Sequence, residues 1–484
     1  MIFKRIKILV IIILFLTIEG VAQDFSRQYQ EFGEAVRKSY NSFRDECNQK
    51  YAEFLRTAWD WYEGKAPLPL PDDKNPIPPR PYQSIEQNPI SIEPIPIKPV
   101  DPTPPPKPIS PVRENPNPIE DSFSVSFYGI ICNVRIPQNL QMILSDCKPN
   151  SLGDVWGVLC SDELNNTIRD CLETRIRYNL CDWAYLQFLI ELGQQCCVNS
   201  NSATFMTAFL YCQSGYQMRL GEDNGHLVML FGSKHYIYDL PYFVIEGELF
   251  YPISETSDRI KICDAEFESE TPMSLYINAE QIIGPSLTGV RKIISKGDFA
   301  LSTKSEVPVE LIKFYNTYPT SAIDSNPLTR WVLYADAPLS EKTKAILYPS
   351  LIEAIGNCSK LDAANKLLNW VQTGFVYEYD DKIWGHDRAF FVEETLYYPY
   401  ADCEDRSILF SRLVRDLLGL DVALIYYPGH LATAVKFDAD VQGDAMLINK
   451  ERYIVCDPTY IGAPVGAQMP GLEYDKAKAI VLQR

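Results

Sequence analysis

A proline-rich stretch divides this chain and limits what its N-terminal part can fold into. Residues 67–118 hold 19 of the 35 prolines in the 484-residue sequence. Proline lacks a backbone N–H and fixes its φ angle, so such a stretch cannot build a packed core of its own. We expect a semi-rigid spacer, up to about 160 Å long at about 3.1 Å per residue. A ligand for a proline-binding module is the alternative interpretation.

An apolar repeat precedes the proline-rich stretch. Steps of three and four residues separate its members: Phe25, Tyr29, Phe32, Val36, Tyr40, Phe43, Cys47, Tyr51, Phe54, Ala58 and Tyr62. The period is about 3.67 residues, which keeps one stripe straight along one helix. The sequence therefore predicts a long amphipathic helix over 24–66. Its stripe either docks on the protein's own body or serves self-association or partner docking through 25–62.

The first residues have the pattern of a secretory signal peptide. Lys4, Arg5 and Lys7 precede an apolar run, and small residues around Ala22 offer a cleavage site. We therefore predict export to the periplasm or the extracellular space, with no membrane span after cleavage. An uncleaved anchor is the alternative, although the apolar run is short for a span.

The net charge and the number of cysteines each exclude one possibility for this protein. The formal net charge of −18 argues against nucleic acid as a partner, because nucleic acid requires a basic surface. The sequence has 13 cysteines, an odd number, so at least one thiol is free or pairs with another chain.

The remaining sequence contains an internal duplication of α+β class. The stretch LVRDLLGLDVALIYYPGHLATAVKF predicts a helix, a glycine stop and two strands, and FMTAFLYCQSGYQMRLGEDNGHLVMLF predicts the same order. Gly215 aligns with Gly419, and His226 with His430, at one offset of 204 residues. The expected segments are a signal peptide (1–23), a helix (24–66), a Pro-rich linker (67–119), a degenerate unit (120–262), a strand-rich connection (263–330) and a catalytic unit (331–484).

One cysteine lies in an unusual setting in the second copy. In YADCEDRSILFSRLVRDLLG, Cys403 stands among charged residues at the expected start of a helix, with Asp402 as its N-cap and Gly419 at its end. The positive end of a helix dipole favours thiolate, the nucleophilic form. Nearby carboxylates oppose thiolate formation, so a basic partner is needed.

His430 and Asp457 are the candidate partners of this cysteine. His430 begins the second strand of the hairpin that follows the helix, and Asp457 stands at the end of a later strand, before a proline. Adjacent strands would bring the carboxylate beside the imidazole, where it would orient the ring. His386, upstream of Cys403, is interpreted as a loop residue rather than a second base.

The motifs DCEDRS, GHLATAV and YIVCDPTY, in this order, resemble the transglutaminase-like superfamily, which includes bacterial transglutaminase-like cysteine peptidases. The resemblance implies papain-like folds, and covers about 361–460 specifically and 150–240 more loosely. It implies Cys403 as nucleophile, His430 as general base and acid, and Asp457 as the orienting residue. It further implies an oxyanion hole built from the Cys403 backbone N–H and one side chain, for which the candidates are Trp384, Tyr398 and Tyr400.

The first copy carries a different set of residues. Asn199 aligns with Cys403, while His226 and Asp239 persist, so we interpret this copy as degenerate and non-catalytic. A local slip that restores Cys197 as a nucleophile is the alternative.

These observations predict an exported thiol enzyme that cleaves, or less readily transfers, acyl groups at peptide or side-chain amide bonds through a thioester. A protein or peptide substrate is expected, and neither a metal nor an organic cofactor is implied. The alternative is a non-catalytic binding or scaffold protein built from two transglutaminase-like units. A third possibility is an assembly factor organised by 25–62.

Overall fold

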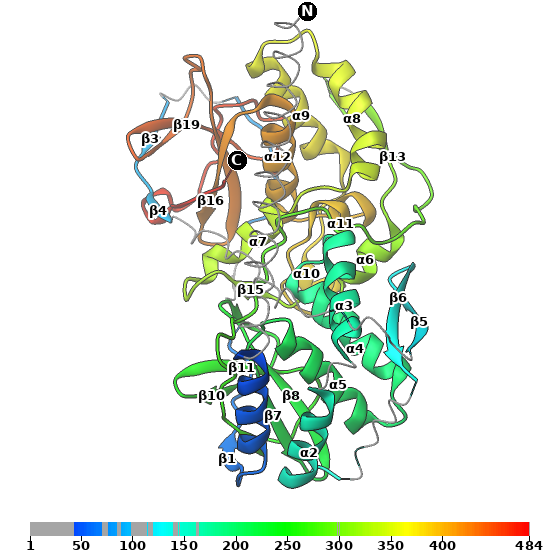
Figure 1. Cartoon of the computed structure of the whole chain (residues 1–484). Coiled ribbons are helices and arrows are strands. Elements are labelled where there is room, and N and C mark those ends of the chain that lie inside the picture. The colour runs from blue at the N-terminus through cyan, green and yellow to red at the C-terminus, as the bar shows by residue number, and fades with distance from the viewer. Residues whose placement is uncertain are drawn as a thin grey trace, which may run out of the picture.

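The computed structural model describes residues 43–69, 76–84, 89–97, 114, 120–138, 144, 146–160, 164–297, 299 and 301–483. The expected signal peptide, the first part of the expected helix and much of the proline-rich stretch lie outside these residues. Within them the fold is α+β, with helices packed against each of two large sheets (Figure 1). In this described part, no helix combines the length and the apolarity needed to cross a bilayer.

The first half of the chain forms a six-stranded antiparallel sheet backed by helices. Its strands, in spatial order, are β1 (Asp60–Glu63), β12 (Arg259–Cys263), β7 (Met218–Asp223), β8 (His226–Gly232), β11 (Glu248–Pro252) and β10 (Phe243–Ile245). The helices are α2 (Pro149–Leu159), α3 (Asn165–Arg177), α4 (Asp182–Cys196) and α5 (Ser200–Gln213). Helix α5 packs on β7 and β8, and α4 packs on α5. A hairpin, β5 (Glu120–Phe127) and β6 (Ile130–Pro137), packs against α3 and α4.

The second half carries a seven-stranded sheet and the helix that begins at Cys403. The strand order is β3 (Ser91–Ile92), β18 (Ala445–Ile448), β19 (Glu451–Cys456), β17 (His430–Lys436), β16 (Asp421–Tyr427), β21 (Lys478–Val481) and β4 (Ile95–Ile97). The helices are α7 (Arg330–Asp336), α8 (Glu341–Ile355), α9 (Lys360–Gly374), α10 (Asp380–Ile383), α11 (Val392–Tyr397) and α12 (Cys403–Leu418). Helix α12 packs on β16 and β17 on one side and on α9 on the other.

Five central strands follow the same order in both sheets. The order β12-β7-β8-β11-β10 in the first sheet corresponds to β21-β16-β17-β19-β18 in the second. In each case the helix that precedes the central hairpin, α5 or α12, packs on that hairpin. By this correspondence β11 takes the place of β19, so the position equivalent to Asp457 follows Pro252. Asp239 instead follows β9 (Tyr236–Ile237), which pairs with β15 (Ser321–Ala322) outside the large sheet, and this corrects its expected placement.

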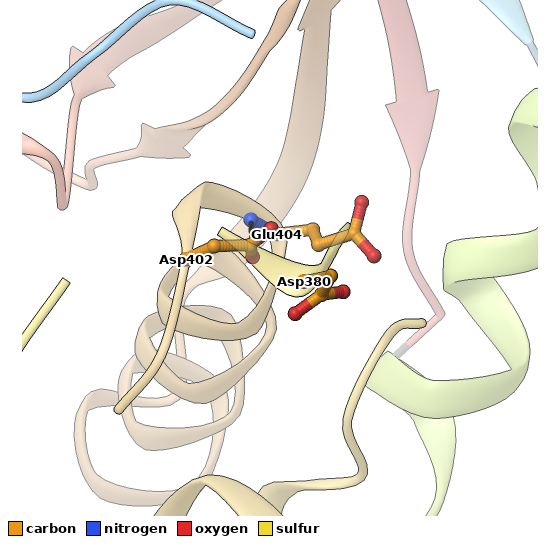
Figure 2. Close-up of side chains that lie close together, drawn as sticks. All are labelled: Asp380, Asp402 and Glu404. Carbon is orange, nitrogen blue, oxygen red and sulfur yellow. Dashed lines mark hydrogen bonds between the residues drawn. The ribbon is translucent and has the colours of Figure 1, made fainter. Parts of the chain in front are cut away.

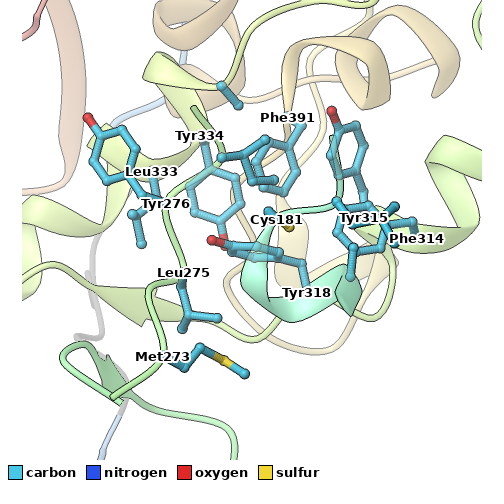
Figure 3. Packing of buried hydrophobic residues seen from close by; sticks show 14 of the residues in the cluster. Cys181, Met273, Leu275, Tyr276, Phe314, Tyr315, Tyr318, Leu333, Tyr334 and Phe391 are labelled. Carbon is cyan, nitrogen blue, oxygen red and sulfur yellow. The ribbon is translucent and has the colours of Figure 1, made fainter. Parts of the chain in front are cut away.

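A single aromatic core joins the two halves. Phe391 stacks on Tyr315 with ring centroids 4.1 Å apart, and Tyr334 and Tyr318 approach it to 4.7 and 5.1 Å. Cys181 of the first half lies in the same cluster (Figure 3). The connecting segment (263–330) therefore contributes buried side chains to this shared core. Its elements are β13 (Arg291–Ile294), β14 (Ser302–Ser305), α6 (Val309–Tyr315), β15 and the short 3-10 helix η2 (Pro327–Thr329).

The expected long helix is shorter at its C-terminal end. In the described residues it spans 43–55, and residues 60–63 form β1, which pairs with β12, the strand that would otherwise be the edge of the sheet. The edge strand offers hydrogen-bond partners that satisfy the backbone, so these few residues are extended despite their helical spacing. Of the four stripe members in the helix, Cys47 and Tyr51 are buried as the docking interpretation requires, whereas Phe43 and Phe54 are 41% and 48% exposed. The helix over 43–55 therefore packs on the protein's own body, but only half of the predicted stripe takes part in that contact.

Parts of the proline-rich stretch form strands of the second sheet, so the prediction of a free spacer is wrong for these residues. Strand β3 pairs with β18 and β4 pairs with β21, at opposite ends of the sheet. Only Glu93 and Pro94 separate β3 from β4. Three residue steps span at most about 11 Å, so the two ends of the sheet lie close together. The sheet is therefore curled into a barrel that this segment closes (Figure 1). A further short strand, β2 (Arg80–Pro81), pairs with β20 (Tyr460–Ile461), and η3 (Tyr474–Lys476) precedes β21.

Candidate active site

Helix α12 begins at Cys403 and has a rigid first turn. The Asp402 carboxylate accepts hydrogen bonds from the backbone N–H groups of Glu404 and Asp405, at 3.0 and 3.3 Å. In return the Asp405 carboxylate accepts from the Asp402 backbone at 3.2 Å, which completes a reciprocal capping box. Gly419 ends the helix in the left-handed conformation, with φ of 61°. The expected start, N-cap and end of this helix are confirmed.

His430 and Asp457 form a buried hydrogen-bonded pair. The His430 Nε2 atom lies 2.9 Å from Asp457 Oδ2, and both side chains are about 99% buried. Strand register explains the approach, because Thr433 of β17 pairs with Cys456 of β19 and places the next residue beside the start of β17. The Asp457 Oδ1 atom accepts from the Thr459 hydroxyl and backbone N–H, at 2.7 and 2.8 Å. These donors fix the carboxylate against the ring.

The electrostatics of this pair favour an ionised Asp457. Burial by itself raises the pKa of the carboxyl. The His430 charge and the hydrogen bonds from His430 and Thr459 outweigh burial and hold the pKa of Asp457 below its ordinary range. The other ring nitrogen, His430 Nδ1, is buried and has no hydrogen-bond partner among the described residues. That nitrogen is the group left to accept or deliver a proton.

A cavity of about 330 Å³ brings Cys403 and His430 to one surface, together with Leu431. Burial raises the pKa of the Cys403 thiol, and a hydrogen bond from the Leu431 backbone partly opposes this, which puts the sulfur next to the first residues of β17. The Ser407 hydroxyl donates to the Leu431 carbonyl oxygen at 3.0 Å and ties α12 to the same strand. Asp457 lies behind His430, and the three candidate residues are thereby gathered at one end of β17.

The net electrostatic effect on Cys403 differs from the expectation based on the helix dipole alone. Burial raises the pKa of the thiol well above its ordinary value, and the Asp402 and Glu404 carboxylates raise it further. Both effects favour the protonated thiol, so a neighbouring base would be needed for it to act as a nucleophile.

Three carboxylates form a buried cluster beside the cysteine. Asp380 is the first residue of α10, Asp402 is the N-cap of α12 and Glu404 lies in the first turn of α12 (Figure 2). One oxygen from each lies within 4.8 Å of the others. Glu404 Oε2 accepts from the Trp331 indole at 2.9 Å, while Glu404 Oε1 is buried and has no hydrogen-bond partner in the part of the chain that the structure describes. Burial, and then the Asp405 carboxylate, raise the pKa of Asp380 to about 9. Hard oxygen ligands at this spacing could hold Ca²⁺ or Mg²⁺.

The sequence analysis did not identify this cluster, although two of its members flank Cys403 in the sequence. That flanking was the available signal for Asp402 and Glu404. The sequence contains no pattern that would link Asp380 or Trp331 to this cluster, because only the tertiary fold brings them to α12.

The expected oxyanion side chains do not reach the cavity. Trp384, Tyr398 and Tyr400 are not among the described residues that line it. They pack on one another instead, with Trp384 and Tyr400 at 5.2 and 6.1 Å from Tyr398. His386, interpreted as a loop residue, lies in a turn after α10, is exposed, and does line the cavity.

Two buried side chains support the site from behind. Gln372 Nε2 donates to the carbonyl oxygens of Asp457 and Ala463, at 3.0 and 3.1 Å. Arg406, on α12, donates to the carbonyl oxygens of Gln372 and Phe375, at 3.1 and 2.9 Å. Helix α9, helix α12 and the loop after β19 are thus held in one arrangement.

The first copy lacks the corresponding constellation. Asn199 caps α5 by accepting from the Ser202 backbone N–H at 2.8 Å. His226 is exposed at the start of β8, and Asp239 lies outside the large sheet. Cys197 is the C-cap of α4, with its sulfur 3.7 Å from that of Cys196, and not at the start of α5. These positions do not form a triad.

No family model, curated protein or solved structure matched the chain in the three comparisons made.

Proposed function

We propose that this chain is an exported thiol enzyme of the transglutaminase-like kind, in which Cys403, His430 and Asp457 act on an amide bond of a protein or peptide. The observation that carries the proposal is the buried His430–Asp457 pair, which leaves His430 Nδ1 without a partner among the described residues, beside a cavity that Cys403 and His430 both line. The first unit serves as a non-catalytic part of the same body.

The proposed reaction passes one proton between Cys403 and His430. His430 Nδ1 accepts the thiol proton while the Cys403 sulfur attacks the carbonyl carbon of the amide. The imidazolium then returns the proton to the leaving amine, and a thioester remains. Water releases the acid in hydrolysis, and an amine releases a new amide in transfer. The buried Asp457 carboxylate stabilises the imidazolium between these steps.

The test is selective alkylation of Cys403. Burial and the flanking carboxylates hold its thiol protonated, so fast labelling requires His430 as a base. We expect iodoacetamide, at about pH 6 to 7, to label Cys403 faster than the partly exposed control thiol Cys358. His430→Ala should remove the difference. Equal rates for the two thiols would favour the binding or scaffold interpretation.

A substitution of the nucleophile gives the second readout. Cys403→Ser should abolish turnover of a peptide library while changing the free energy of unfolding by about 1 kcal/mol or less. Cys358→Ser is the matched control and should retain turnover. Activity that survived Cys403→Ser would place the nucleophile elsewhere, with Cys197 the next residue to test.

A further inference from the structure

A segment of the proline-rich stretch runs past the candidate active site. Pro76 lines the same cavity as Cys403 and His430. The next residue, Ile77, donates its backbone N–H to the Gly429 carbonyl oxygen at 2.8 Å, and Gly429 directly precedes His430. We call residues 76–83 the proline strap.

The other end of the proline strap holds the loop that carries Asp457. Strand β2 pairs in parallel with β20, and the Tyr82 backbone N–H donates to the Ile461 carbonyl oxygen at 2.8 Å. Tyr460 of β20 in turn donates its backbone N–H to Asp457 Oδ1 at 3.2 Å. The strap therefore contacts both loops of the His430–Asp457 pair.

The composition of the strap makes it stiff. Its residues 76, 78, 79 and 81 are prolines, so they lack N–H groups and have fixed φ angles. The N–H groups of Ile77 and Tyr82 both point to the barrel and are used there. The strap has few free donors for pairing with a further strand, and the Pro76 ring cannot rotate aside as a flexible side chain would.

We propose that the proline strap is a fixed wall of the candidate active-site cavity, and that Pro76 limits the size of the group that can reach the Cys403 sulfur. The inference rests on the proposed function and narrows its substrate class. The substrate is an extended peptide whose side chain on the strap side, next to the scissile bond, is small. A bulky or branched side chain at that position meets a ring that is held in place at Ile77.

The test compares two thiol reagents of different size on the full chain. The alkylation rate of Cys403 is measured by peptide mass spectrometry with iodoacetamide and with fluorescein maleimide. We expect Pro76→Gly to raise the rate ratio of the large to the small reagent about threefold or more, equivalent to about 0.65 kcal/mol at 1.36 kcal/mol per factor of ten. Ile77→Pro, which removes the N–H donated to Gly429, should raise the ratio in the same direction.

Pro78→Gly is the matched control, because Pro78 is exposed, lies on the same strap and is not among the described residues that line the cavity. It should leave the ratio unchanged. Equal ratios for Pro76→Gly, Ile77→Pro and the unmodified chain, with melting temperatures unchanged, would overturn the inference. So would an equal rise in Pro78→Gly. The rate ratio reports only how easily each reagent reaches Cys403. A failure of the proposed function is seen in a different measurement, because Cys403 would then be labelled at the same rate in His430→Ala as in the unmodified chain.

Discussion

At the scale of single residues, burial and local partners decide how each titratable group behaves. Asp457 and Cys403 are both in the candidate site, yet their pKa values move in opposite directions relative to ordinary values. Asp457 has the His430 charge and hydroxyl and amide donors around it, whereas Cys403 has two carboxylates beside it. In the proposed reaction, His430 is therefore the base on which the chemistry depends.

His235 offers a pH test outside the site. Its side chain is 4% exposed, Nδ1 has no partner among the described residues, and Nε2 lies 3.4 Å from the Ser274 hydroxyl. Burial, and then the Lys234 charge, lower the pKa of His235 from 6.5 to about 4. The folded-state pKa is depressed, so the unfolded chain binds the proton first and stability is lost as the pH falls from about 6.5 toward about 4.

We expect the unmodified chain to lose about 2 to 3 kcal/mol relative to His235→Gln between about pH 7 and pH 4.5. The measurement is urea unfolding of both proteins at the two pH values. A stability difference that is the same at both values would show that His235 does not titrate in this way.

The sequence identified several site residues for reasons that are visible locally. Cys403 follows an N-cap and precedes a helical apolar pattern, and His430 and Asp457 stand at strand ends. The oxyanion side chains could not be placed in the same way. Trp384, Tyr398 and Tyr400 are near Cys403 along the chain, but their side chains pack on one another, which only the tertiary contacts determine.

At the scale of elements, the first turn of α12 carries both the candidate nucleophile and part of the carboxylate cluster. Cys403 stands between two members of the carboxylate cluster, and α10 supplies the third. A cation bound there would take the place of the proton that the raised pKa of Asp380 favours, and would satisfy Glu404 Oε1, which has no partner among the described residues. Binding to the folded state alone raises stability by mass action.

We expect Ca²⁺ at about one hundred times its dissociation constant to stabilise the full chain by about 2.7 kcal/mol. Differential scanning fluorimetry with and without a chelator measures the shift. Glu404→Gln should abolish it, whereas Asp381→Asn, an exposed residue that lines the cavity outside the cluster, should keep it. An unchanged melting temperature at millimolar Ca²⁺ and Mg²⁺ would rule out a cation role for the cluster.

The edges of the sheets explain where element prediction failed. Residues 60–63 continue a helical spacing, and residues 91–97 are proline-rich, yet both are strands. Each pairs with a strand that would otherwise be the edge of its sheet and that is formed by residues far away in the sequence, namely β12, β18 and β21. Local propensity is a weak signal for short segments, and available edge hydrogen bonds override it.

At the scale of the whole molecule, the two halves share one core. Phe391 contacts Tyr315, Tyr318 and Tyr334, and the cluster continues to Cys181 in the first half. We therefore expect the two halves to unfold together, because separating them would expose these aromatic rings to water.

We expect one calorimetric transition for the unmodified chain. Phe391→Ala should cost about 3 to 5 kcal/mol and split the transition, since it weakens the contact between the halves. Phe390→Ala is a matched control, because Phe390 is also fully buried but packs on Trp384 and Tyr398 within the second half. Two transitions in the unmodified chain, or a split caused equally by both variants, would contradict a shared core.

The sequence by itself determined the α+β class, the limits of α12 and the order of helix, hairpin and strand in each half, because hydrophobic periodicity, caps and glycine stops act over a few residues. Only the tertiary structure decided that the proline-rich stretch closes a barrel, that Asp380 and Trp331 meet the first turn of α12, and that Asp239 lies away from His226. These outcomes depend on strand edges and buried contacts between distant residues, and such contacts form only when the whole chain excludes water from one core.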